Sequence, residues 1–142
     1  MARKSIGLLI GLLVLGAVVM TLQQVAAIFH PLPPGLEPMN PDHAEAFTEH
    51  LAAMPTAAAV VGFLSAIRGA ACGAVAAGRT GRRPRALPGV VVALALAGSI
   101  VNWTSFAHPT WFVVGQLVAY PAVLFGVVKL LEAKLPRPAQ PV

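Results

Sequence analysis

The chain has 142 residues, of which 57% are hydrophobic and 11% charged, and its mean hydropathy is +0.77. Soluble domains typically carry about 25% charged residues, so this composition excludes an ordinary soluble protein and predicts one integral membrane domain, residues 1–142. The net charge of +5 would suggest a nucleic-acid partner in a soluble protein, but here the basic residues flank apolar segments and we expect no nucleic acid.

The first apolar segment covers residues 5–29 and follows a short basic head with Arg3 and Lys4. A secretory signal peptide begins in a similar way, but its apolar core is only about 7–15 residues long. This run is long enough for a transmembrane helix, which needs about 20 residues. We therefore predict an uncleaved first span, with Gly7 and Gly11 forming a GxxxG pattern near its start.

Residues 30–55 form the long polar stretch of the chain. It opens with HPLPPGLEP, whose prolines exclude a helix. Asn40 then suits an N-cap, and Pro41 suits the first helical position. Apolar and acidic residues recur on different faces of the stretch that follows. We therefore predict a short amphipathic helix over 41–54, lying at the membrane surface with Phe47 and Leu51 inward.

The rest of the chain predicts three more spans, over 56–78, 86–106 and 111–131, separated by an arginine-rich loop at 79–85 and a short turn, and followed by a tail at 132–142. The predicted fold class is all-α: a four-helix transmembrane bundle with the amphipathic helix between its first two spans.

The charges predict the topology. With four spans, all Lys and Arg residues outside the spans fall on one side, and the loops of the other side contain none. The positive-inside rule then places both termini in the cytoplasm. The loop arginines are candidates for contact with anionic lipid headgroups of the bilayer: Arg79, Arg82, Arg83 and Arg85.

Arg68 lies near the middle of the second span, where a charge costs about 2.5–3.5 kcal/mol on insertion scales. None of the predicted spans contains an acidic residue that could pair with it. Three interpretations stay open. Arg68 extends toward the headgroups or is held by neutral oxygens of this chain, it contacts a partner subunit, or it forms part of a substrate or ion site.

Two groups of intramembrane residues complete the candidates. Small residues of the second span predict a close contact with another helix. The favoured interpretation places this contact within the monomer, and the alternative places it between two copies of the chain. The residues are Gly62, Ala66, Gly69, Ala70 and Gly73. Polar residues nearer the outer face either form hydrogen bonds between helices, the commoner case, or line a small cavity above Arg68: Gln23, Asn102 and Gln116 among them.

The sequence shows no catalytic, cofactor or metal motif. Its four histidines lack the three- or four-residue spacing of a helical metal pair, so we expect no metal. The single cysteine, Cys72, is expected to be buried as a small apolar residue. There is no glycine-rich phosphate loop and no pair of intramembrane carboxylates, so we expect neither a cofactor nor an enzyme.

The proline-rich loop 30–38, the exit Leu51-Ala52-Ala53-Met54-Pro55 and the turn His108-Pro109-Thr110-Trp111-Phe112 resemble a pattern in small bacterial four-span membrane proteins of unknown function. The resemblance implies the same topology in a bacterial inner (plasma) membrane, and it implies no activity.

Two functional hypotheses follow. The first is a non-enzymatic accessory or scaffolding subunit that packs against other membrane subunits or against itself, motivated by the small size, the small-residue faces and Arg68. The alternative is a small oligomeric transporter or channel in which Arg68 and Gln116 line an anion-favouring path.

Overall fold

The computed structural model describes residues 2–38, 40–106 and 108–135. The regular structure of these residues is helical throughout, without a strand. In chain order the elements are α1 (Ala2–Phe29), the 3-10 helix η1 (Pro41–His43), α2 (Ala44–Ala52), α3 (Thr56–Gly81), α4 (Ala86–Ser105) and α5 (Thr110–Lys134). The prediction of an all-α bundle is confirmed.

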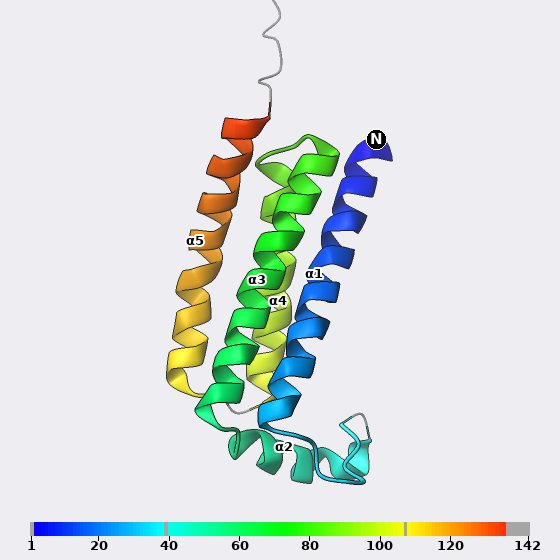
Figure 1. The fold of residues 1–142 in the computed structure, drawn as a ribbon, viewed down its shortest axis with the longest axis vertical. Helices are drawn as coiled ribbons and strands as arrows, with labels where there is room; N and C mark the ends of the chain where they lie inside the picture. Colours follow the sequence, from blue (N-terminus) through cyan, green and yellow to red (C-terminus); the bar gives the residue numbers. More distant parts are fainter. Residues whose placement is uncertain (1, 39, 107, 136–142) are drawn as a thin grey trace, which may run out of the picture.

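Four of the helices, α1, α3, α4 and α5, are long and apolar enough to cross a membrane. They run alongside one another, and α2 lies across one end of them (Figure 1). The start of α1, the α3–α4 connection and the end of α5 lie at the opposite end. We call these the α2 end and the arginine end; the arginine end carries Arg3, Arg79, Arg82, Arg83 and Arg85.

Several boundaries differ from the predicted ones. Helix α3 continues through Arg79 to Gly81, so the arginine-rich loop is shorter than the predicted 79–85. Arg82 ends the helix in the left-handed conformation with φ 50°, and the N–H of Arg83 donates to the carbonyl of Gly78 at 3.1 Å. The backbone hydrogen bonds formed around Arg82 satisfy carbonyl groups of the last helical turn. Helix ends of this kind usually have a glycine at the left-handed position. Helix α5 extends into the predicted tail, and residues 136–142 of that tail lie outside the described residues.

The polar segment before α3 folds as its capping residues suggest. The Asn40 side chain accepts a hydrogen bond from the N–H of Asp42 at 3.1 Å, with Pro41 at the first helical position. The predicted helix over 41–54 divides into η1 and α2. Its partly buried face, with Phe47 and Leu51, faces the bundle, whereas Glu45 and Glu49 are exposed.

Helix α3 is the centre of the bundle and packs against α1, α4 and α5. Its contact with α1 is backbone against backbone. A Cβ placed on Gly73 would lie 2.6 Å from the carbonyl oxygen of Gly11, and one on Gly7 would lie 2.7 Å from the backbone N of Gly81. Small residues spaced four apart on both helices allow this close approach. In lipid the hydrophobic effect does not drive helices together, so close van der Waals packing of this kind stabilises the contact.

The hydrophobic core occupies the half of the bundle nearer the arginine end. Ala70, Ala74 and Ala77 of α3 are fully buried there. They pack with larger side chains of α4 and α5: Leu87, Val91, Val92, Tyr120, Val127 and Leu131. This half is therefore closely filled, and the open space of the molecule lies in the other half.

Candidate functional site

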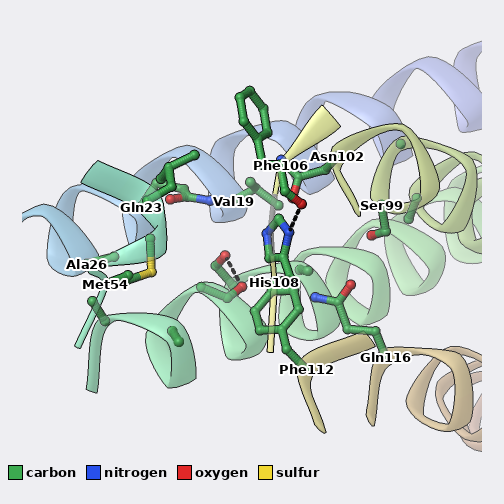
Figure 2. Close-up of a pocket in the computed structure, with 18 of the residues that line it drawn as sticks. Val19, Gln23, Ala26, Met54, Ser99, Asn102, Phe106, His108, Phe112 and Gln116 are labelled. Carbon is green, nitrogen blue, oxygen red and sulfur yellow. Dashed lines mark hydrogen bonds between the residues drawn. The ribbon is translucent and has the colours of Figure 1, made fainter. Parts of the chain in front are cut away.

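A cavity of about 700 Å³ occupies the half of the bundle nearer the α2 end. All four long helices line it, and α2 closes its end with Phe47, Leu51 and Ala52. Figure 2 shows part of the lining, including Gln23 of α1, Asn102 of α4 and Gln116 of α5. Cavities of 300–1,000 Å³ are typical of small-molecule sites. We therefore take this cavity as the first candidate site.

The helical repeat explains which side chains face the cavity. Leu15, Val19 and Gln23 follow one another at helical spacing along α1, as do Ala95, Ser99 and Asn102 along α4. The wall contributed by α3 consists of small residues: Ala58, Ala59, Gly62, Ser65 and Ala66. Because these side chains are short, and because Gly98 of α4 has no side chain at all, the facing helices leave the space between them unfilled.

Two hydrogen bonds between side chains join α4 to α5 beside the cavity. The Trp103 indole N–H donates to Oε1 of Gln116 at 3.2 Å, and the hydroxyls of Ser99 and Tyr120 lie 2.6 Å apart. Ser99 precedes Trp103 by four residues and Tyr120 follows Gln116 by four, so the two bonds lie one helical turn apart. They fix the rotation and the axial position of α5 against α4.

None of the residues lining the cavity is Asp, Glu, Lys or Arg. His108, from the turn between α4 and α5, lies beside it with its ring centroid 4.9 Å from that of Phe112. Its Nδ1 lies 2.8 Å from the carbonyl oxygen of Phe106. A carbonyl can only accept, so Nδ1 carries the proton.

Helix α2 is held over the cavity by contacts at two points. The His30 ring, directly after α1, stacks on the His50 ring with centroids 3.8 Å apart, and its Nε2 donates to the His50 carbonyl at 2.8 Å. On the other side, Phe47 and Phe106 form an edge-to-face pair at 5.5 Å. Partial burial, and to a lesser degree the neighbouring His30, lowers the pKa of His50.

Arg68 lies outside this cavity. It is exposed on the face of α3 that also presents Val60, Leu64 and Cys72. Within the described ranges it forms no hydrogen bond or ion pair, and the carboxylate that pairs with an arginine, Glu132, is bound to Arg85. The predicted polar residues Gln23, Asn102 and Gln116 line the cavity and form no hydrogen bond with Arg68 in the described part of the chain.

One expectation is wrong, and the two residues of the channel hypothesis lie apart within the chain. The structure separates Arg68 from Gln116, the residues that the channel hypothesis places along one path, because one faces outward and the other lines the cavity. Cys72, expected to be buried, is exposed on the outer face of α3. Apolar composition alone does not reveal burial in a membrane protein, because lipid-facing positions are as apolar as the core.

The small-residue candidates divide between two places. Gly69, Ala70 and Gly73 are buried, and a Cβ on Gly69 would lie 2.6 Å from Val19 of α1. Gly62 and Ala66 line the cavity. The four arginines proposed for lipid contact, Arg79, Arg82, Arg83 and Arg85, are all exposed at the arginine end.

The four histidines do not gather in one cluster, although two of them stack on each other. His43 accepts a hydrogen bond at Nδ1 from the N–H of Glu37 at 3.1 Å, His30 and His50 stack together, and His108 lies at the α4–α5 turn. No group of three or more possible metal ligands forms within residues 2–38, 40–106 and 108–135.

The sequence interpretation missed the pairing of Trp103 with Gln116. A signal was available, since the turn between the last two spans is short and forces them into an antiparallel hairpin. In such a hairpin each position on one helix has a counterpart at the same depth on the other.

No known protein family, curated protein or solved structure matches the chain. The resemblance to small bacterial four-span proteins therefore remains a prediction.

Proposed function

We propose that this protein is a non-enzymatic accessory subunit of a membrane complex, and that it binds a helix of its partner along the exposed face of α3 around Arg68. The supporting observation is an arginine that is exposed at the middle of a span and has no partner within the described chain. Such residues in membrane helices ordinarily pair with another group or face a wet cavity.

The depth of Arg68 favours a protein partner over a lipid headgroup. Twelve residues of α3 precede it and thirteen follow, so about 18–20 Å of helix separates it from either end at 1.5 Å per residue. The hydrocarbon layer is about 30 Å thick, which places Arg68 close to its centre. An acidic side chain on a neighbouring helix would neutralise the charge at that depth.

Charge also argues against a second copy of this chain on the same face. Four of the five acidic residues lie between positions 37 and 49, and Glu132 lies near the arginine end. A symmetric dimer through this face would bring two arginines together in a low-dielectric medium, where like charges repel strongly. We therefore commit to a different protein whose spanning helix carries Asp or Glu.

Site-specific photo-crosslinking in native membranes tests this function. A photoreactive residue replaces Leu64, one turn from Arg68 on the same face, and a control replaces the exposed Phe125 of α5. We expect an adduct from position 64 with a membrane protein that has a carboxylate within a span. Arg68→Leu should abolish it, whereas Cys72→Ala, a matched change on the same face, should leave its yield unchanged.

A charge exchange then identifies the contact. Arg68→Asp should abolish the adduct, and replacing the partner's intramembrane acid by Arg should restore it. An adduct that persists in Arg68→Leu, an adduct with a second copy of this chain, or no adduct at all would overturn the proposal.

For the topology, we propose that the arginine end faces the cytoplasm of a bacterial inner membrane and contacts anionic headgroups through its arginines. The concentration of basic residues at this end supports it. A phosphatase that is active only outside the cytoplasm should be active when inserted at Gly35 and inactive when fused after Lys134. The reverse pattern would contradict this orientation.

A further inference from the structure

The mouth of the cavity opens between α1 and α4. The wall formed by α3 and α5 is buried, including Ala59, Ser65 and Gln116. On α4 the lining residues Leu94, Gly98 and Asn102 are exposed, with Leu94 48% exposed. Toward the arginine end α1 and α4 meet, where a Cβ on Gly11 would lie 3.2 Å from Val91. Since both helices are apolar enough to span a membrane, a ligand would enter from the bilayer.

One donor in the cavity wall points to the chemistry of the ligand. Gln116 is only 2% exposed. An indole N–H can only donate, so the bond from Trp103 fixes the amide oxygen of Gln116 on the Trp103 side and leaves its NH₂ group free. That NH₂ has no hydrogen-bond partner among the described residues, although Gln116 lines the cavity. No buried side-chain N or O atom of the described residues lacks a partner, so this NH₂ is reached from the cavity rather than sealed in the core. A donor that faces the cavity favours a ligand that presents an acceptor oxygen at this depth.

The walls restrict the ligand further. With no charged side chain in the lining, a charged head would be desolvated without compensation, so the head should be neutral. Flat rings border the space: His108 lies against Phe112 (Figure 2), and Phe47 lies against Phe106. Aromatic faces pack well against a planar head. The exposed, apolar mouth allows a long tail to extend into the lipid.

We propose that this cavity binds a prenylated quinone from the bilayer, with one quinone carbonyl accepting from the Gln116 amide and the prenyl tail leaving between α1 and α4. A quinone combines a neutral planar head, carbonyl acceptors and a long apolar tail. The site does not depend on the partner helix proposed for Arg68, which lies on another face.

Trp103 provides the readout, because it is hydrogen-bonded to the same glutamine and quinones quench indole fluorescence. Trp111→Phe leaves Trp103 as the sole tryptophan. The protein is placed in phosphatidylcholine nanodiscs and titrated with a short-chain ubiquinone analogue. We expect quenching that saturates near one quinone per protein. Quinone retained after gel filtration is measured in parallel, so that binding does not rest on fluorescence alone.

Two substitutions and a matched control test the location. Gly98→Phe should fill the cavity, because no described atom lies within 4 Å of a Cβ at this position and the ring therefore has room. Saturable quenching should then disappear and leave only the linear quenching by quinone that has partitioned into the lipid. Gly126→Phe, at an exposed position of α5 with the same free space, should bind like the parent. Gln116→Leu should weaken binding by about fivefold, as expected for one neutral hydrogen bond.

Competition tests the head group. Dioleoylglycerol, a neutral lipid without a planar head, and phosphatidylglycerol, an anionic one, should not displace the quinone. Non-saturable quenching, quenching unchanged by Gly98→Phe, or equal competition by dioleoylglycerol would overturn the proposal.

Discussion

Small residues have opposite effects in the two halves of the bundle. Toward the arginine end, Gly73 lies against the backbone of α1 so closely that a methyl group has no room. In the half nearer α2, Gly98 has no described atom within 4 Å of the place its Cβ would occupy. In one half, missing side chains let two helices touch, and in the other they leave a cavity. Glycine content alone therefore does not distinguish packing from a site.

The largest expected effect comes from a substitution that disrupts the close packing of α1 against α3. Gly73→Leu would place a side chain against the carbonyl oxygen of Gly11 and force α1 away from α3. Overpacking of this kind typically costs about 1–3 kcal/mol or more, and we expect about 3 kcal/mol here. Unfolding in mixed micelles measures it. Gly126→Leu, with free space around it, is the control, and equal stability of the two variants would contradict the close contact.

The second prediction concerns a substitution that adds a side chain to the half of the bundle that contains the cavity. Gly98→Leu should stabilise the protein by about 1 kcal/mol, because glycine is a poor residue inside a helix and the new side chain meets open space. The same unfolding assay applies. A destabilisation comparable to that of Gly73→Leu would show that no cavity exists beside α4.

A smaller effect is expected where α3 ends. Arg82 adopts a left-handed conformation with φ 50°, which costs an L-residue roughly 1–2 kcal/mol. Arg82→Gly should relieve this strain and stabilise the fold by about 0.5–1 kcal/mol after the greater freedom of unfolded glycine is subtracted. Arg83→Gly, at a position without positive φ, should bring no gain, and a gain of equal size there would refute the explanation.

The smallest effect concerns the hold of α2 on the cavity. The pKa of His50 is lowered in the folded protein, so its contribution to stability is present above the ordinary pKa of about 6.5 and is lost as pH falls below it. Hydrogen exchange of α2 should therefore accelerate between pH 7.5 and pH 5.5, relative to α3. His50→Phe preserves an aromatic ring and the backbone carbonyl but cannot become charged, so its exchange should lack this additional pH dependence.

The sequence predicted the elements well because their signals are local. Apolar length marked the four spans, and Asn40 followed by Pro41 marked the start of the short helix. The faces of the helices were harder to predict. Arg68 and Ser65 are three residues apart, yet one is exposed and the other buried, since burial depends on which neighbours α3 has. Lipid-facing and core-facing residues are equally apolar, so hydropathy does not separate them.

The cavity was predictable only in part. Gln23, Asn102 and Gln116 were grouped by depth, and the structure places all three in the cavity lining. The contribution of α2 was not predictable from its amphipathic pattern, because a helix resting on a membrane surface and a helix closing a bundle need the same apolar face. Contacts such as Phe47 with Phe106 distinguish the two cases, and they join residues far apart in the chain.

The paired hydrogen bonds between α4 and α5 have a consequence for the length of the chain. Surface connections between helices usually tolerate insertions. An extra residue that extends α5 at its start, rather than being taken up by the turn, would rotate that helix by about 100° and displace it by about 1.5 Å relative to α4. Trp103 and Ser99 would lose their partners together. The α4–α5 turn should therefore be the connection least tolerant of a change in length, although it lies at the surface.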